Sequence, residues 1–249
     1  MAAEHTEHGP LHQFLVNPLY ELPEFYGIDI SITNSALFML LAVFVTTVLF
    51  VVAMRKRATI PGRAQSMAEI TYQFVEGILE ENVGHESKKY FPFIFTLFLF
   101  ILAMNLLGML PYSFAPTSHI IVTFGLGATV FVMITLIALI KKGPIGFIKH
   151  FIPEGLPFFI VPLMLVIEMV SYLSRPFSLG IRLAANIAAG HTLMKVIAAF
   201  VFPLGLFGVL PIAFLMFMTG LEIFVSILQA YVFTLLSCMY LGEALSDHH

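Results

Sequence analysis

Several polar and ionisable side chains lie within one long apolar run of the sequence. Residues 162–199 are rich in Val, Leu, Ile, Met, Phe and Ala, yet they include Glu168, Arg175, Arg182, Asn186, His191 and Lys195. A charged side chain at membrane depth costs about 3 kcal/mol or more, and an arginine cannot avoid this cost by losing its proton. We therefore expect Arg182, in the middle of the run, to be retained for its charge.

Helical spacing would divide these side chains between two faces. Glu168, Arg175 and Arg182 are seven residues apart and would share one slowly drifting stripe. Asn186 is four residues beyond Arg182 and would lie near that stripe, whereas His191 is nine residues beyond it and would lie on the opposite face. The helix would carry a fixed positive charge on one side and, on the other, an imidazole that can titrate near neutral pH.

A second polar stripe is expected in the last apolar run, residues 211–241. Glu222 and Gln229 are seven residues apart, and Tyr240 is eighteen residues beyond Glu222. Ionisable groups inside a membrane usually mark ion paths or proton relays. Arg182, His191 and Glu222 together therefore indicate ion or proton translocation.

Other members of the two stripes have simpler interpretations. Arg175 could extend to the membrane surface or pair with Glu168, and Lys195 is typical of an interfacial anchor. Tyr240 is typical of an aromatic side chain at the membrane interface.

Composition defines the broad class. Hydrophobic residues make up 59% of the chain and charged residues 11%, and the mean hydropathy is +0.95. Lipid offers the backbone no hydrogen-bond partners, so spans are helices or closed barrels, and no alternating barrel pattern appears. The single cysteine, Cys238, argues against a disulfide framework or a Cys-rich metal site. We predict an all-α polytopic membrane protein with about five membrane-embedded helices and one amphipathic surface helix.

We place the membrane-spanning helices at the apolar runs that are long enough to cross a hydrocarbon core of about 30 Å. The predicted spans are residues 34–54, 91–110 and 120–140, followed by two long helices at 162–199 and 211–241, with the amphipathic helix at 63–83. At about 1.5 Å per residue the last two would be about 57 Å and 46 Å long. We therefore expect both to be steeply tilted, with Pro176 and Gly180 permitting a bend in the first.

The apolar runs divide the chain into two parts. Residues 34–249 would form one membrane domain, and residues 1–33 an outer, acidic and poorly structured segment. Lys and Arg residues follow the first span, precede the second and follow the third, whereas the connection at 113–118 has none. By the positive-inside rule, the N-terminus is outside and the C-terminus cytoplasmic. The amphipathic helix, with Met67, Ile70 and Phe74 on its apolar face, would lie on the cytoplasmic membrane surface or against a partner subunit.

Three segments resemble the a subunit of rotary ATP synthases, in its α-proteobacterial and mitochondrial form. They are Ser174–His191 (SRPFSLGIRLAANIAAGH), Glu222–Phe233 (EIFVSILQAYVF) and Asn105–Pro111 (NLLGMLP). The spacing Arg-x3-Asn-x3-Gly-His, followed later by Glu-x6-Gln, is highly specific. Many relatives have an acid three residues beyond the position of Asn105, where this chain has Gly108, so a role for that acid does not carry over.

The resemblance implies a proton-channel stator subunit of F-type ATP synthase. Such a subunit provides two offset aqueous half-channels to the carboxylates of a c-subunit ring, which couples proton translocation to ring rotation and ATP synthesis. Arg182 matches the arginine that faces the ring carboxylates. Asn186 matches the polar residue one turn along, and Gln229 the glutamine of the last helix near the arginine.

The resemblance also indicates which residues line each half-channel. Glu222 and His191 match the pair that lines the outer half-channel, with the residue types exchanged relative to some bacterial members. Ser178 and Glu168 match positions linked to the cytoplasmic half-channel.

The implied partners are the c-subunit ring, the b and b′ peripheral-stalk subunits, the remaining F1Fo subunits, the lipid bilayer and protons. Nucleic acid, a cofactor and a metal are not implied, and the implied location is the bacterial inner membrane. The sequence contains no phosphate-binding loop pattern. The chain is therefore expected not to be catalytic alone, with ATP handled by partner subunits.

Two other classes of function compete with this interpretation. A secondary transporter would often carry inverted repeats, and no repeat is visible in the sequence. A haem-bearing redox subunit needs paired axial ligands. His191 is the only histidine deep in an apolar run, since His119 and His150 lie at the edges of loops.

Overall fold

The computed structural model describes residues 16, 18–20, 31–55, 58, 60–110, 113–150 and 159–246, and most of these residues are helical. The predicted all-α class is confirmed. The α-helices of the described residues are α1 (Asn34–Ala53), α2 (Arg63–Val83), α3 (Ser87–Gly108), α4 (Ile120–His150), α5 (Val161–Ala199) and α6 (Val209–Leu245), with short 3-10 helices η2 (Gly84–Glu86), η3 (Pro116–Ser118) and η4 (Gly205–Gly208). All of the α-helices except α2 are apolar and long enough to cross a membrane.

Local sequence accounts for where several helices begin and end. The Thr33 hydroxyl accepts a hydrogen bond from the Ala36 amide at 3.3 Å and caps the start of α1. Gly84 ends α2 with a φ of 71°, which favours glycine. The predicted span at 120–140 is longer than expected, because α4 continues to His150 past a break at Gly143, where φ is 70°, followed by Pro144.

The outer N-terminal segment has some regular structure where the structure describes it. Strand β1 (Pro18–Tyr20) pairs antiparallel with β2 (Ile32–Thr33), directly before α1. Within a segment expected to be poorly structured, these residues therefore form a short strand pair. The rest of residues 1–30, apart from Val16, lies outside the described residues.

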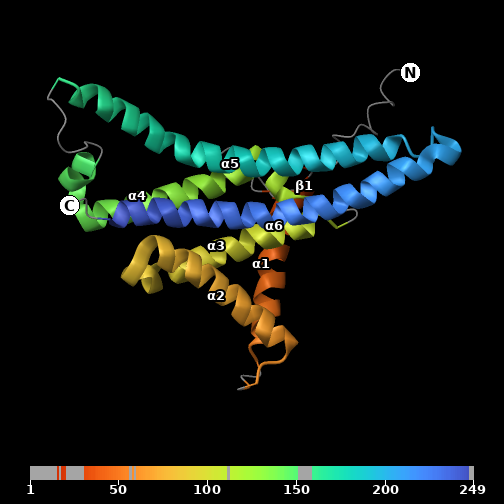
Figure 1. The fold of residues 1–249 in the computed structure, drawn as a ribbon, viewed down its shortest axis with the longest axis horizontal. Coiled ribbons are helices and arrows are strands. Elements are labelled where there is room, and N and C mark those ends of the chain that lie inside the picture. The colour runs from red at the N-terminus through yellow and green to blue at the C-terminus, as the bar shows by residue number, and fades with distance from the viewer. Residues whose placement is uncertain are drawn as a thin grey trace.

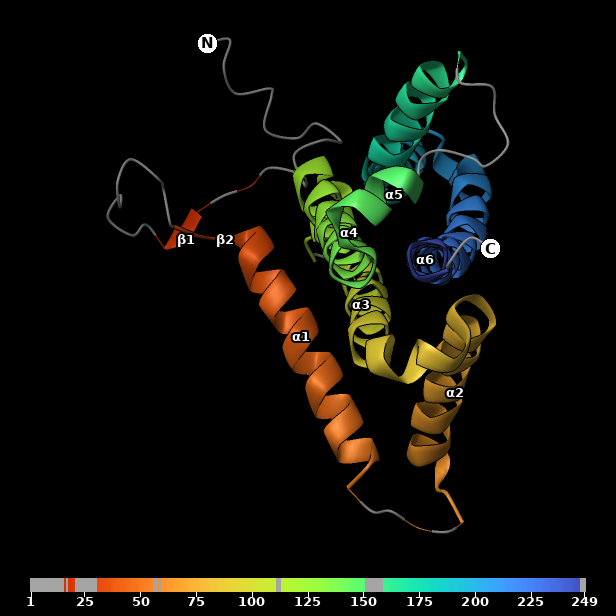
Figure 2. The same ribbon diagram turned by 90° about the vertical axis from the view of Figure 1, so that its left-hand side faces the viewer.

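Helices α5 and α6 form a long antiparallel hairpin that dominates the shape of the molecule (Figure 1). Helix α4 lies along α5, α3 lies along α6, and α1 runs steeply across the direction of the hairpin (Figures 1 and 2). The connection between α5 and α6 contains η4 and lies at the end of the hairpin far from the chain's C-terminus (Figure 1).

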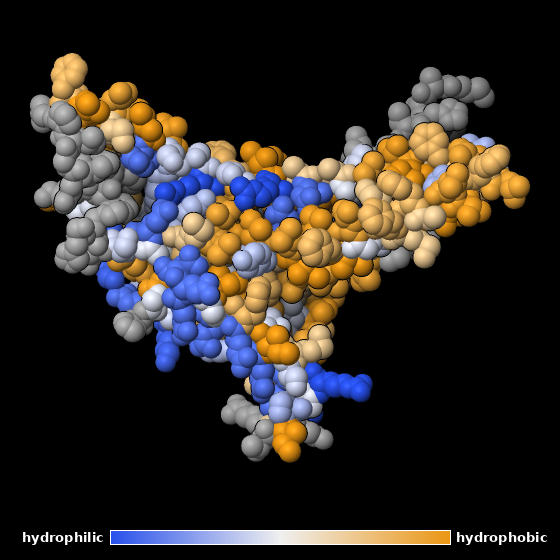
Figure 3. Space-filling model, in the orientation of Figure 1, coloured by the Kyte–Doolittle hydropathy of each residue, from blue (hydrophilic) through white to orange (hydrophobic). Residues whose placement is uncertain are grey.

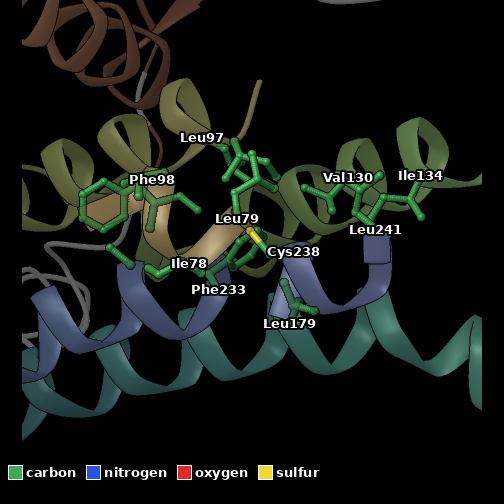
Figure 4. Packing of buried hydrophobic residues seen from close by; sticks show 14 of the residues in the cluster. Ile78, Leu79, Leu97, Phe98, Val130, Ile134, Leu179, Phe233, Cys238 and Leu241 are labelled. Carbon is green, nitrogen blue, oxygen red and sulfur yellow. The ribbon is translucent and has the colours of Figure 1, made fainter. Parts of the chain in front are cut away.

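The core lies where α2, α3, α4, α5 and α6 meet. Figure 4 shows one buried residue from each of these helices, Leu79, Phe98, Val130, Leu179 and Cys238. Helix α2 contributes only part of its predicted apolar face, since Val75, Ile78 and Leu79 are buried, while Met67 and Ile70 remain exposed. It packs on α3 and α6 of its own chain.

Glycines allow α4 and α5 to approach closely. A Cβ at Gly180 would lie 2.8 Å from the Phe124 Cα, and one at Gly127 would lie 2.7 Å from the Pro176 carbonyl oxygen. Helix α5 runs without interruption through Pro176 and Gly180. These two residues, expected to permit a bend, pack against the backbone of α4, and α5 changes direction partway along its length (Figure 1). The contact with α4 helps to determine which side of α5 is left free.

Candidate functional site

Arg182 projects from the free side of α5. Its side chain is exposed, and within the described residues its guanidinium makes one hydrogen bond, from Nη2 to the Ser178 hydroxyl at 3.4 Å. Its neighbours Phe177 and Ile181 are also exposed and apolar. A guanidinium that projects from an apolar surface with one long hydrogen bond is available to an anionic partner from another chain.

His191 and Glu222 face each other across the α5–α6 interface. The distance from His191 Nε2 to Glu222 Oε1 is 3.7 Å, and the two side chains are 12% and 7% exposed. Neither Glu222 oxygen, nor the His191 Nε2, has a hydrogen-bond partner among the described residues. Buried polar groups normally have hydrogen-bond partners. The atoms of this pair therefore need a water molecule as a partner, or a proton passed from one side chain to the other.

A pocket lies beside this pair, between α5 and α6. It has a volume of about 200 Å³ and is lined by Asn186, Gly190, Met218 and Glu222 among others. Such a volume has room for water next to the carboxylate. Asn186 is half-buried and reaches this pocket, so it lies between exposed Arg182 and buried Glu222.

Gly190 is part of the motif that indicates the family, but the sequence predicted no role for it. A Cβ at this position would lie 2.7 Å from Glu222 Oε1 and 3.0 Å from its carboxyl carbon. The absence of a side chain at Gly190 is therefore what allows the carboxylate of α6 to lie against α5. The signal available in the sequence was a glycine directly before the histidine, in a helix where glycine is otherwise unfavourable.

The remaining predicted residues are distributed along the hairpin. Ser178 is exposed one turn before Arg182 and bonds to it. Gln229 on α6 and Glu168 on α5 are half-buried. Glu168 is fourteen residues from Arg182, so the structure does not bring it to the arginine.

The expected pairing of Arg175 with Glu168 is wrong. Arg175 Nη1 lies 2.6 Å from Glu243 Oε2, near the end of α6. The Arg175 guanidinium also lies over the rings of Tyr240, at 4.6 Å, and Tyr172, at 5.4 Å. A spacing of seven residues puts Glu168 two turns away, beyond the three- and four-residue spacings at which helical side chains meet. Tyr240, expected as an interfacial aromatic, is part of this cluster.

Asn105 connects α3 to α6 close to the His191–Glu222 pair. Its side-chain amide donates to the Ser226 carbonyl at 3.1 Å, and Ser226 is one helical turn beyond Glu222. Gly108, one turn along α3, packs against Ala115, where a Cβ would lie 2.7 Å from that of Ala115. The acid that many relatives have at this position would not fit here without movement of the Ala115 backbone.

The chain is similar to known proteins over nearly all of its length. The family described as "ATP synthase A chain" matches residues 36–242. The ATP synthase subunit a of Rhodospirillum rubrum is 48% identical over 242 residues, which is 97% of this chain and all of the relative. The corresponding protein of a Wolbachia from Brugia malayi is 46% identical over 236 residues, covering 94% of this chain and 98% of the relative.

These matches decide between the classes of function considered from the sequence. A secondary transporter and a haem-bearing redox subunit are both set aside, because the match extends over nearly the whole chain at high identity. The chain belongs to the family of ATP synthase subunit a, the non-catalytic, proton-translocating stator subunit of the Fo sector of F-type ATP synthase.

Proposed function

We propose that Arg182 separates two half-channels and faces the carboxylates of a c-subunit ring. The observation that carries this proposal is the exposure of Arg182 on the free side of α5, while His191 lies nine residues further on, largely buried against α6. A fixed cation between the half-channels blocks a direct proton leak. It also favours loss of the proton from each ring carboxylate that approaches it, because an opposite charge stabilises the ionised form.

The outer half-channel would pass the His191–Glu222 pair. A separation of 3.7 Å is bridged by a small side-chain rotation or by one water molecule. The adjacent pocket of about 200 Å³, which Asn186 lines, would let water reach the carboxylate and lead a proton toward the ring. Each proton crossing the membrane releases about 2.3 kcal/mol per 100 mV, so several are needed for each ATP.

The cytoplasmic half-channel would lie along Ser178 and Glu168, on the half of α5 that precedes Arg182. Ser178 holds the guanidinium by its hydroxyl, and Glu168 offers a half-buried carboxylate nearer the start of the helix. Gln229 would act from α6 as a polar neighbour of the arginine. The ring would then rotate so that each carboxylate passes from one half-channel to the other.

The ring would dock on the exposed apolar residues beside Arg182. They include Phe177 and Ile181 on α5 and Phe224 and Leu228 on α6. The b and b′ subunits of the peripheral stalk would contact the mostly exposed surface of α1, of which only Ser35, Ala42 and Ala53 are buried. The remaining F1Fo subunits would carry the chemistry of ATP.

The location would be the bacterial inner membrane, with the N-terminus outside and the C-terminus cytoplasmic. Lys141 pairs with Glu86 at 2.6 Å and Lys142 donates to the Ser246 carbonyl at 2.7 Å. The end of α4, the start of α3 and the end of α6 are therefore gathered at one basic side. Figure 3 agrees, since hydrophilic residues gather on this part of the visible face and the α5–α6 connection is largely hydrophobic. The positive-inside rule assigns the basic side to the cytoplasm.

The test is the variant Arg182→Ala in the whole complex reconstituted into liposomes. ATP-driven acidification should fall to background, while the content of each subunit stays equal to that of the wild-type complex. Arg182→Lys should also fail substantially, because an ammonium lacks the planar, multi-donor geometry of the guanidinium. Normal pumping by a fully assembled Arg182→Ala complex would contradict the proposal.

A further inference from the structure

The end of α6 is held by three other helices of this chain. The residues of α6 that take part are Gly242 and Glu243, in its last turn, and Ser246, directly after it. They contact α2, α5 and α4 respectively, each through a different kind of interaction. Leu241 and Leu245, in the same stretch, are buried in the core.

A close approach of two backbones joins α6 to α2. A Cβ at Gly242 would overlap the Asn82 carbonyl oxygen, one residue before the end of α2. Glycine is unfavourable inside a helix, and the lack of a side chain at Gly242 is what allows the two helices to touch. The ends of α2 and α6 are therefore fixed against each other.

Two charged side chains join the end of α6 to α5 and α4. Arg175 Nη1 on α5 lies 2.6 Å from Glu243 Oε2, and Lys142 Nζ on α4 donates to the Ser246 carbonyl at 2.7 Å. The Ser246 carbonyl lies at the C-terminal end of α6, where the helix dipole favours a cation. We call these three contacts, together with that of Gly242, the α6 anchor, formed by Gly242–Asn82, Arg175–Glu243 and Lys142–Ser246.

The opposite end of the α5–α6 hairpin has no comparable contacts among the described residues. Phe202, Leu206 and Phe207, in or beside η4, are 91%, 90% and 70% exposed. The amides of Gly205 and Phe207 donate to the carbonyls of Phe202 and Leu204, within the connection itself. Figure 1 shows this end of the hairpin extending beyond the other helices. Within the described part of the chain, the hairpin is therefore fastened at one end.

We propose that the α6 anchor holds the α5–α6 hairpin in position against the force of the rotating ring. This inference rests on the proposed function. A ring carboxylate paired with Arg182 would pull on the middle of α5 as the ring turns, and the anchor would prevent α6 from sliding along α5. Such sliding would separate His191 from Glu222, which lie 3.7 Å apart on the two helices. The anchor residues are thus positioning residues, which act on proton translocation through the position of α6.

The force on the hairpin depends on the proton gradient that the complex works against. During ATP-driven pumping, each proton must be moved against the gradient already built up, so the free energy needed for each step of the ring rises with the gradient. Loss of the anchor should therefore have little effect at the start of pumping. It should limit the final gradient, because the hairpin yields when the opposing force is greatest.

The experiment compares charge-removing variants of two adjacent lysines. Lys142→Met removes the donor to Ser246, whereas Lys141→Met removes the 2.6 Å pair with Glu86 of η2 and leaves the contact with α6 in place. Glu243→Gln removes the ion pair with Arg175. Each whole complex is reconstituted into liposomes, and ATP-driven acidification is followed with a pH-sensitive dye.

The glycine contact has its own matched control. Gly242→Ala places a methyl group against the α2 backbone, whereas Gly77→Ala adds one on α2 where nothing lies within 4 Å. Each variant is compared with liposomes that hold enough wild-type complex to give the same initial pumping rate. This comparison removes any effect of a smaller number of active complexes, which is all that a general loss of stability would cause.

We expect Lys142→Met, Glu243→Gln and Gly242→Ala each to reach a final ratio of proton concentrations at least threefold smaller than that of the matched wild type. ATP hydrolysis should continue after the gradient has stopped rising. Lys141→Met and Gly77→Ala should reach the wild-type ratio. Proton flow without ATP should equal that of the wild type, because Arg182 is intact.

Two results would overturn the anchor. One is a final gradient equal to that of the matched wild type in Lys142→Met and Glu243→Gln, and the other is a raised proton flow without ATP, which would indicate a static leak. Arg175→Glu with Glu243→Arg should reach a larger gradient than Arg175→Glu alone, because it restores an ion pair between the same helices. If Gly242→Ala fails to assemble, the side-chain variants decide the question.

Failure of this inference is distinguishable from failure of the proposed function. If Arg182→Ala abolishes pumping while Lys142→Met and Glu243→Gln behave like Lys141→Met, the anchor is wrong and the half-channel model stands. If a fully assembled Arg182→Ala complex pumps normally, the proposed function itself is wrong.

Discussion

Gly190 and Glu222 are in contact across the α5–α6 interface, because the glycine leaves space that the carboxylate occupies. A Cβ at Gly190 would lie 2.7 Å from Glu222 Oε1, well inside the usual contact distance. The carboxylate thereby comes within 3.7 Å of His191 Nε2, on the residue that follows Gly190. The position of the Glu222 carboxylate relative to His191 thus depends on Gly190, a residue without a side chain.

Gly190→Ala should displace the Glu222 carboxylate and slow proton translocation. We expect ATP synthesis by the reconstituted complex to fall at least fivefold at equal subunit content. The matched control is Gly220→Ala, two residues before Glu222, where an added Cβ meets nothing within 4 Å and helix propensity improves by up to about 1 kcal/mol. Combining Gly190→Ala with Glu222→Asp, whose shorter side chain would relieve the crowding, should recover part of the activity. Wild-type synthesis by Gly190→Ala alone would show that the close approach is not needed.

Glu222 and His191 should behave as one functional unit. The exchanges Glu222→His and His191→Glu, made singly, leave two imidazoles or two carboxylates at the site, whereas the double exchange restores one of each. We expect the double variant to synthesise ATP faster than either single variant, in a double-mutant cycle that isolates the coupling. Membranes carrying any of these variants should stay proton-tight, because Arg182 is intact. Additive losses in the cycle would mean that the two residues act independently.

The Arg175–Glu243 pair should fasten the first half of α5 to the end of α6. Because the side chains are 23% and 48% exposed, solvent screening limits the ion pair to about 1 kcal/mol or less. The contact of Arg175 with the Tyr240 ring adds roughly 0.5 to 1 kcal/mol. Arg175→Gln should therefore lower the unfolding temperature in detergent by a few degrees. Arg175→Glu should lower it further, and the addition of Glu243→Arg should restore part of the loss. No recovery in the double variant would show that the pair contributes nothing.

Gly180→Ala should push α5 away from α4. The added Cβ would lie 2.8 Å from the Phe124 Cα and 2.9 Å from its nitrogen, and backbone atoms cannot move aside as a side chain can. Overpacking of this kind costs about 1 to 3 kcal/mol. Thermal unfolding of the purified subunit, followed by circular dichroism, should show a clearly lower unfolding temperature than that of the wild type. Gly125→Ala, on α4 with nothing within 4 Å of the new Cβ, is the matched control and should be unchanged or slightly more stable.

Much of this protein can be predicted from its sequence, because the signals are local. Long apolar runs indicate spans, since a bilayer of fixed thickness requires about 20 apolar residues. The helical repeat alone places Arg182 and His191 on opposite faces. In the structure Arg182 is exposed and His191 is largely buried against α6. The spacing of Arg182, Asn186, Gly190 and His191 also carries enough information to indicate the family.

The tertiary structure alone decided which residues from different helices meet. Glu222 lies next to His191, and Arg175 pairs with Glu243 although Glu168 is on its own helix. Helical periodicity gives the direction of a side chain relative to its own helix axis but not the distance or rotation of the neighbouring helix. Those depend on close contacts such as Gly180 against Phe124 and Gly190 against Glu222, which arise only when the helices pack. For the same reason, the contacts of Gly242 with Asn82 and of Lys142 with Ser246 could not be identified from the sequence, because they join helices that are far apart in the chain.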